Sequence, residues 1–253
     1  MSDSTQAAAT AGDQYLLLAD ISGYTAFMAS VERAHGVDFS DGIPAGFSVL
    51  GDLLDAVIQG VQPDFTVVKL EGDAVFAAAP ATSLDGRGED VLDRIETLYD
   101  AFRARRELAR GARDHVCTAC PVVANLDLKV VVHRGQAVQQ TLGSQADLLG
   151  PAVNLVHRLL KNGIQPRLGH RGYAFLTDAA VAKLVLADVG VAHREDYPDV
   201  GPTSGRVVPL GEDPSLARPV PEAADGSDGL SAERSMEGTQ GSADPGADGR
   251  DPR

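Results

Sequence analysis

Two aspartates lie where a divalent cation could be bound. Asp20 ends the short apolar run YLLLAD and is followed by a turn and a segment of helical character, while Asp73 lies between two β-rich runs in LEGDAV. Sequential elements of this kind often pack side by side, so the two carboxylates can meet at one edge of a sheet. Two convergent carboxylates suit Mg²⁺, and the turn after Asp20 offers N–H groups and a helix dipole to a phosphate. Either aspartate alone is more often a cap or turn former, but together they indicate metal and phosphate chemistry.

The elements that would position these aspartates follow from the hydrophobic periodicity. Short apolar or alternating runs predict strands, and apolar residues at i, i+3 and i+4 predict one-sided helices. The expected fold is α+β, a ferredoxin-like antiparallel sheet with helices on one face. The predicted strands are 15–21, 65–70, 74–79, 126–138, 172–176 and 206–210, and the predicted helices are 25–36, 44–61, 90–108, 150–163 and a short one from Asp178.

Charge and composition limit the classes of partner. The chain has 253 residues and a net charge of −14, which argues against a nucleic-acid-binding surface and against a polybasic membrane anchor. No apolar window reaches about 18 residues, and the start lacks the basic flank and apolar core of a signal peptide, so we expect a cytoplasmic protein. Residues 1–13 and 211–253 are predicted to be disordered, which leaves a folded domain at 14–210. The tail holds ten acidic residues against four arginines and is interpreted as a solubilising segment rather than a docking segment.

Four other residues have side chains that could take part in metal, redox or acid–base chemistry. Cys117 and Cys120 are the only cysteines and follow His115, which gives half of a zinc-like spacing. A reduced pair without a ligand is favoured, and a redox pair or a metal shared across a dimer stays an alternative. His133 lies in an apolar strand and is expected to make a core or supporting hydrogen bond rather than to act in catalysis.

Four segments in order resemble the motifs of the class III nucleotide cyclases, the adenylyl and guanylyl cyclase catalytic domain, over roughly residues 15–161. LLLADISGYTAF is similar to the first metal motif, and the resemblance implies that Asp20 and the Ile21 carbonyl bind two Mg²⁺ or Mn²⁺ ions. VVKLEGDAVFA is similar to the second motif, which assigns Asp73 to the metals and Lys69 to the base. LKVVVHRGQAV resembles the strand that usually contains His-x-Gly.

The segment DLLGPAVNLVHRLL resembles the family's transition-state segment. The resemblance implies that Asp147 binds the base with Lys69 and that Asn154 and Arg158 are the catalytic residues. Asn154 and Arg158 are four apart on one helix, so they share a face and can reach the same phosphate. A lysine donor beside an aspartate acceptor matches N1 and N6 of adenine, whereas guanine would leave both groups unpaired, so ATP is favoured over GTP.

The family places its site across a head-to-tail homodimer, and the resemblance therefore implies two equivalent sites shared between two copies. Two departures indicate a divergent, short, stand-alone bacterial branch: the stretch between Gly135 and Gly150 is short, and His157 occupies a position that is usually small.

The sequence thus predicts a cytoplasmic adenylate cyclase-like lyase of signal transduction, which converts ATP to cyclic AMP and pyrophosphate. Two alternatives remain open. One is a cyclase that uses GTP or a pyrimidine nucleotide, and the other is a non-catalytic nucleotide-binding or interaction module with the same fold.

Overall fold

A computed structural model describes residues 9–36, 39–40, 42–111, 120–169 and 172–211. The predicted tail beyond Gly211, residues 1–8, and the candidate ligands His115 and Cys117 lie outside these ranges, as does the side chain of Cys120. Within the described part of the chain, no helix combines the length and the apolar composition that are needed to cross a membrane.

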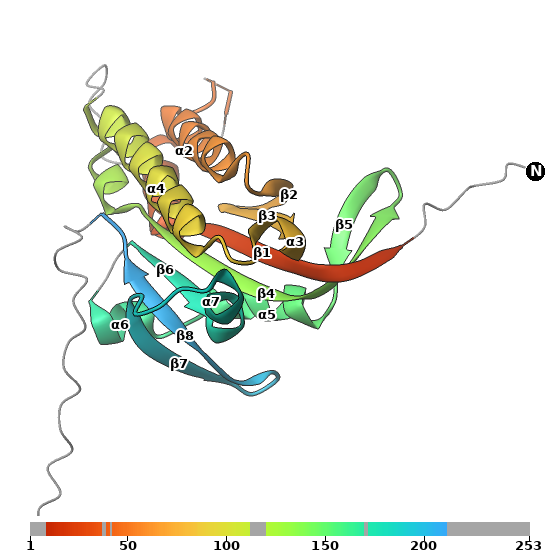
Figure 1. Ribbon diagram of the computed structural model, residues 1–253. Coiled ribbons are helices and arrows are strands. Elements are labelled where there is room, and N and C mark those ends of the chain that lie inside the picture. The colour runs from red at the N-terminus through yellow and green to blue at the C-terminus, as the bar shows by residue number, and fades with distance from the viewer. Residues whose placement is uncertain (1–8, 37–38, 41, 112–119, 170–171, 212–253) are drawn as a thin grey trace, which may run out of the picture. The chain divides into compact units, whose positions relative to one another are not determined.

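One mixed sheet runs through the domain (Figure 1). Its order is β2-β3-β1-β4-β6-β8-β7, and β5 pairs with the far end of β4. Every pairing is antiparallel except that of β4 with β6. The strands are β1 (Thr10–Ser22), β2 (Thr66–Glu71), β3 (Ala74–Pro80), β4 (Asp127–Leu142), β5 (Gln145–Leu149), β6 (Tyr173–Thr177), β7 (Val191–Tyr197) and β8 (Gly201–Pro209).

Both faces of the sheet are buried. Side chains alternate between the two faces along a strand, so neighbouring residues belong to different apolar clusters. On β1, Tyr15 and Leu17 belong to one apolar cluster, and Leu16 and Leu18 belong to another. The first cluster packs against the long helices, and the second against α5 and α6. The helices are α1 (Tyr24–His35), α2 (Ala45–Val61), α3 (Ala81–Leu84), α4 (Gly88–Gly111), α5 (Pro151–Leu159), α6 (Ile164–Leu168) and α7 (Asp178–Leu184), with a 3₁₀ turn η1 (Cys120–Asn125).

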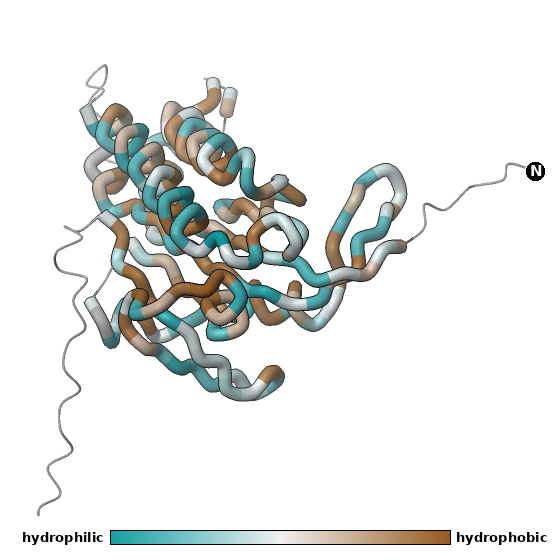
Figure 2. The backbone as a smooth tube through the Cα atoms, viewed as in Figure 1, coloured by the Kyte–Doolittle hydropathy of each residue, from teal (hydrophilic) through white to brown (hydrophobic). Residues whose placement is uncertain are grey.

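The predicted α+β fold with a mostly antiparallel sheet is confirmed, with one difference: α5 and α6 lie on the face opposite to α2 and α4. Figure 1 shows α2 and α4 side by side over the sheet, and Figure 2 shows hydrophilic residues on their outer sides. The two helices approach closely at Gly60, where a Cβ would lie 2.7 Å from a methyl carbon of Leu98. A larger residue at Gly60 would therefore push α2 and α4 apart.

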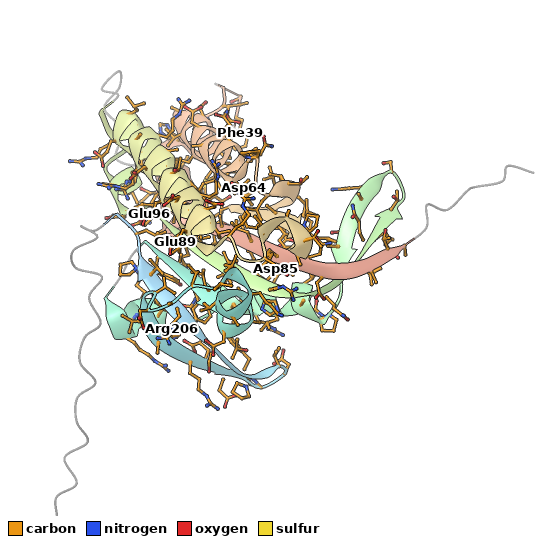
Figure 3. The ribbon with its side chains drawn as sticks, viewed as in Figure 1. Phe39, Asp64, Asp85, Glu89, Glu96 and Arg206 are labelled. Carbon is orange, nitrogen blue, oxygen red and sulfur yellow. The ribbon has the colours of Figure 1, made fainter. Side chains whose placement is uncertain are left out.

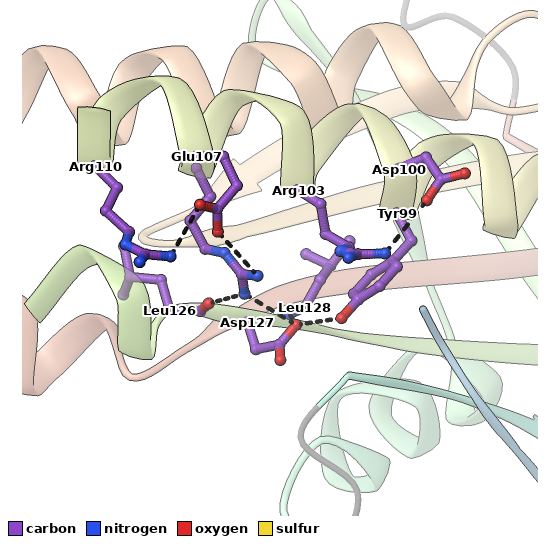
Figure 4. Close-up of polar contacts among 9 residues, drawn as sticks. Tyr99, Asp100, Arg103, Glu107, Arg110, Leu126, Asp127 and Leu128 are labelled. Carbon is purple, nitrogen blue, oxygen red and sulfur yellow. Dashed lines mark hydrogen bonds and ion pairs between the residues drawn. The ribbon is translucent and has the colours of Figure 1, made fainter. Parts of the chain in front are cut away.

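A buried polar cluster fixes α4 to the start of β4 (Figure 4). The Tyr99 hydroxyl donates to Asp127 Oδ1 at 2.8 Å, and Arg106 donates to the Leu126 carbonyl at 2.7 Å. Burial and the neighbouring Asp127 carboxylate raise the pKa of the Tyr99 hydroxyl, which stays protonated as the donor. Asp127 pairs with Ser22 at the end of β1, so this cluster also fixes the sheet beside Asp20.

The boundaries differ from the prediction at several places. β1 begins at Thr10 and pairs Thr10 with Gln139, so residues 10–13 belong to the sheet rather than to a disordered N-terminus. β5 and β7 were not predicted, because QADLL is short and VAHREDY is mostly polar. The turn end of the β4–β5 hairpin projects beyond the other strands (Figure 1), while β5 contacts β2 through Asp147 and Lys69.

Candidate functional site

The structure brings Asp20 and Asp73 to the same edge of the sheet. In the antiparallel pairing of β1 with β3, Asp20 lies opposite Ala74, the residue after Asp73. The Ile21 N–H donates to the Asp73 carbonyl at 3.3 Å. Because the N–H and C=O of one residue point to the same side of an extended strand, the Ile21 carbonyl faces the same edge. The three groups that the resemblance assigns to metal binding therefore lie together.

The electrostatics at this edge favour a bound cation. Burial raises the pKa of the Asp20 carboxyl, and the nearby Lys129 ammonium opposes that shift. Burial also raises the pKa of Asp73, and the charge of Asp20 raises it further. Lys129 Nζ lies 3.6 Å from an Asp20 carboxylate oxygen and offsets part of the repulsion. Two partly buried carboxylates that repel each other would be stabilised by a divalent cation between them.

The turn after Asp20 leads directly into α1. Gly23 has φ +86°, and a Cβ there would lie 3.0 Å from the Asn125 carbonyl oxygen, so a glycine is required. The first turn of α1 contains no acidic residue, and none of the described side chains caps it. Its N–H groups are therefore available to an anion beside the carboxylates.

The donor set fits a metal that also binds a phosphate. In the described ranges, no group of three or more His, Cys, Asp or Glu side chains could hold a metal ion by itself. Two carboxylates and one carbonyl fill only part of the coordination shell of Mg²⁺, which commonly keeps waters and takes oxygens from substrate phosphates. The residues present are thus suited to a metal that arrives with a nucleotide.

Lys69 and Asp147 form a second group, on β2 and β5. Lys69 Nζ lies 3.3 Å from both carboxylate oxygens of Asp147, although 78 residues separate the two in the chain. Burial lowers the pKa of Lys69, but hydrogen bonds to Glu71 and Asp147 outweigh it and raise the pKa overall. Asp147 Oδ1 also accepts from the N–H of Leu148 at 2.8 Å, which fixes the carboxylate plane. A donor and an acceptor are therefore held together at one place, as the resemblance requires.

Asn154 and Arg158 form a third group, on the exposed face of α5. Both line a depression of about 450 Å³ together with Lys161 and Asp199. Arg158 forms a hydrogen-bonded ion pair with Asp199, which lies between β7 and β8. The depression thus holds two cationic side chains, an amide, the His157 imidazole and one competing carboxylate.

The group formed by Asp20 and Asp73 has no direct polar contact with the other two groups in the described part of the chain. Among the described residues, no hydrogen bond or ion pair joins Asp20 or Asp73 to Lys69, Asn154 or Arg158. The structure adds to these groups four polar residues that the sequence did not indicate. The alternation of side chains along β4 predicts the face on which Lys129 lies. The contacts between residues that are distant in the chain cannot be read from a single sequence. The added residues are Lys129 beside Asp20, Glu71 beside Lys69, and Lys161 and Asp199 beside Arg158.

His133 is a supporting core residue, which agrees with its predicted role. It is 8% exposed on β4, and its Nδ1 lies 2.9 Å from Thr177 Oγ1. Thr177 Oγ1 also accepts from the Ala180 N–H and caps α7. The Thr177 hydroxyl can then donate to a neutral imidazole, and a protonated ring would disturb this arrangement.

Acid should therefore destabilise the fold through His133. Burial lowers its pKa from 6.5 to about 4, so the unfolded chain takes up the proton at higher pH than the folded chain does. The free energy of unfolding should fall by up to about 3 kcal/mol as pH drops from about 6.5 to 4. Urea unfolding at several pH values measures this loss. In His133→Gln, the decrease in the free energy of unfolding between these pH values should be smaller by about 3 kcal/mol. An unchanged decrease would contradict the role of His133 in the acid sensitivity.

Comparisons with known proteins agree with the fold. A family model described as a protein of unknown function (DUF2652) matches residues 50–167. The uncharacterized protein Rv2561/Rv2562 of Mycobacterium tuberculosis is 32% identical over 165 residues, which cover 64% of this chain and 73% of that protein.

Solved structures with the same fold include adenylyl and guanylyl cyclases. The adenylyl cyclase CyaB from P. aeruginosa matches with a TM-score of 0.56 at 15% identity, over 79% of this chain and 96% of that chain. The guanylyl cyclase Cya2 matches with a TM-score of 0.54 at 16% identity, over 82% and 98%. A bacterial light-regulated adenylyl cyclase matches with a TM-score of 0.54 at 15% identity, over 79% and 53%, so the chain spans about half of that protein. At these identities the likeness establishes a shared fold.

Proposed function

Since this chain belongs to the family of the mycobacterial protein Rv2561/Rv2562 and has the fold of the class III adenylyl and guanylyl cyclase catalytic domains, we propose that it is a metal-dependent nucleotide cyclase that converts ATP to 3′,5′-cyclic AMP and pyrophosphate. The observation that carries the proposal is the convergence of Asp20, Asp73 and the Ile21 backbone beside the uncapped N-terminus of α1. The proposal includes the cytoplasmic location and the signalling role expected from the sequence.

Asp20, Asp73 and the Ile21 carbonyl would hold two Mg²⁺ or Mn²⁺ ions. When bound, these ions would lower the pKa of the ribose 3′-hydroxyl and neutralise charge on the phosphates. The N–H groups at the start of α1 would bind phosphate oxygens next to them. Lys129 would lose part of its interaction with Asp20 when the Asp20 carboxylate binds a metal, since a carboxylate oxygen that binds the metal interacts less strongly with the Lys129 ammonium.

Lys69 and Asp147 would recognise the base. The Lys69 ammonium would donate to adenine N1, and the Asp147 carboxylate would accept from the N6 amino group. Guanine has a donor at N1 and an acceptor at O6, so it would leave both protein groups without a matching partner. Lys69 and Asp147 already contact each other, and this preorganisation reduces the ordering cost of binding.

Asn154 and Arg158 would act on the reacting phosphate. Attack of the 3′-oxygen on the α-phosphorus forms one P–O bond and releases pyrophosphate, and negative charge develops on the phosphoryl oxygens. An arginine donor is worth a few kcal/mol to such a transition state. Lys161 lines the same depression and would bind the departing pyrophosphate.

We also propose that two copies form each site in a head-to-tail homodimer. One copy would supply Asp20 and Asp73, and its partner would supply Lys69, Asp147, Asn154 and Arg158. The absence, among the described residues, of any hydrogen bond or ion pair that joins Asp20 or Asp73 to Lys69, Asn154 or Arg158 within one chain supports this arrangement. Two identical sites would then be related by the twofold axis.

Asp199 should compete with the nucleotide for Arg158. The two side chains are about half exposed, so their ion pair is worth little, and its removal should have a modest effect. We expect Asp199→Asn to lower the dissociation constant for ATP about threefold by freeing Arg158. Asp196→Asn, an exposed change on the same hairpin, is the control. Weaker ATP binding in Asp199→Asn, with normal binding in the control, would show that Asp199 instead supports the site.

The contact of Arg158 with Asp199 favours a second candidate function. A chain that keeps its arginine paired with Asp199 could bind a nucleotide without turning it over, as a regulatory module with this fold.

Metal-dependent release of pyrophosphate distinguishes these functions. The proposed cyclase should release pyrophosphate from ATP with Mn²⁺ or Mg²⁺ and should stop when EDTA is added. Tight ATP binding by calorimetry without pyrophosphate release would favour the binding module. Faster turnover of GTP, CTP or UTP than of ATP would support a nucleotide cyclase whose preferred substrate is not ATP.

A further inference from the structure

Glu71 is shared between the base-recognition group and the helix that carries Asn154 and Arg158. Its Oε1 lies 3.2 Å from Lys69 Nζ, and its Oε2 lies 2.7 Å from Nε2 of His157 on α5. Residues of β2 and α5 are thereby joined through one carboxylate. The Phe76 ring packs against His157, with ring centroids 5.2 Å apart, and supports the imidazole.

The hydrogen-bond partners of His157 fix the orientation of its imidazole ring. Its Nδ1 lies 2.7 Å from the Val153 carbonyl oxygen, which can only accept. Nε2 faces the Glu71 carboxylate, which also accepts when ionised. The two contacts fix the ring between the backbone of α5 and Glu71.

The arrangement also limits the freedom of Lys69. An ammonium has three N–H donors, and here Asp147 and Glu71 each accept one. One donor is left for a nucleotide base. Without Glu71, the flexible lysine chain could turn in several ways while it kept its contact with Asp147.

We propose that Glu71 is a positioning residue for base selection, which holds Lys69 beside Asp147 with one carboxylate oxygen and is itself held by His157 with the other. This inference rests on the proposed function, because it concerns how Lys69 reads the base. Glu71 itself would not contact the nucleotide. Its removal should lower the preference for ATP over GTP more than it lowers affinity for nucleotides in general.

Two replacements of Glu71 separate positioning from fold stability. Glutamine can accept from Lys69 with its carbonyl oxygen and can donate from its amide nitrogen to the Nε2 of a neutral His157. Glu71→Gln should therefore keep both contacts and stay within about threefold of the native ratio of ATP to GTP affinities. Glu71→Ala removes both contacts and should lower this ratio about tenfold.

The experiment measures dissociation constants for ATP and GTP by calorimetry with Mg²⁺ on the full chain. The variants are Glu71→Ala, Glu71→Gln and His157→Ala, and the matched control is Glu96→Ala on the exposed side of α4, where Figure 3 labels the residue. Thermal unfolding checks that each variant folds. His157→Ala should reduce the ratio about threefold, since Glu71 would lose one of its two anchors.

A native ratio in Glu71→Ala, or an equal loss of affinity for both nucleotides, would overturn the positioning role. If Glu71→Ala does not fold, a Glu71→Gln ratio as low as that of a Lys69→Ala variant would overturn it. If the native chain binds neither nucleotide, the proposed function fails as well. If it prefers ATP in every variant, only the role of Glu71 fails.

Discussion

Replacing Asp73 by asparagine should reduce cyclic nucleotide formation by about a thousandfold or more, because a neutral amide is a poor ligand for Mg²⁺ and only one of the two proposed carboxylate ligands, Asp20, would be left. The same change should leave the metal-free fold at least as stable as the native fold. Burial and the charge of Asp20 raise the pKa of Asp73, so its ionised form costs folding free energy at neutral pH. Asparagine removes this cost.

The two effects are measured with a product assay and with thermal unfolding with and without Mn²⁺. Mn²⁺ should raise the melting temperature of the native chain and should raise that of Asp73→Asn less, because a ligand stabilises only the state that binds it. Asp52→Asn, an exposed change on α2, is the control and should behave as the native chain. Full activity in Asp73→Asn would remove Asp73 from the metal site. A large loss of stability in metal-free buffer would assign it a structural role instead.

Mixing two inactive variants should restore activity if each site is shared between copies. Asp20→Asn would remove one proposed metal ligand, and Arg158→Ala would remove the arginine proposed to stabilise the transition state. Each variant alone should therefore lose about a hundredfold or more of the cyclase activity. In an equal mixture that re-associates at random, half of the dimers contain one copy of each. Each of these mixed dimers has one site with all native residues, so about a quarter of the native activity should return.

This mixture is measured against each variant alone at the same total concentration. The control mixture is Asp20→Asn with Asp73→Asn, in which both changes lie in the same group and no native site can form. Recovery in the first mixture with none in the second confirms a shared site. No recovery, with dimers shown to exchange, would mean that each chain builds its own site.

The long, strongly periodic elements were predictable from the sequence, and the pairing of polar elements was not. The apolar run at 15–21 and the one-sided pattern at 44–61 predicted β1 and α2, because burial of one face requires those repeats. β7 was missed because its residues alternate weakly, and it is held in place by its hairpin with β8. The placement of α5 on the second face of the sheet follows from tertiary packing and not from its own sequence.

The residues of the candidate site were likewise predictable only in part. Asp20 and Asp73 could be placed together because β1 ends where β3 begins, and Lys69 and Asp147 could be matched only through the resemblance. Their direct contact depends on the β4–β5 hairpin, which places Asp147 opposite Gln140. Glu71 and Asp199 carried no signal, since an acidic residue in a β-turn region is common for other reasons.

The products of the reaction with each of four nucleoside triphosphates test the proposed function most directly. The purified full chain with Mn²⁺ should convert ATP to 3′,5′-cyclic AMP and pyrophosphate in equal amounts, identified by mass spectrometry, and should convert GTP, CTP and UTP more slowly. The Asp73→Asn chain should form neither product. If the native chain forms no cyclic nucleotide from any of the four triphosphates, the protein is not a nucleotide cyclase.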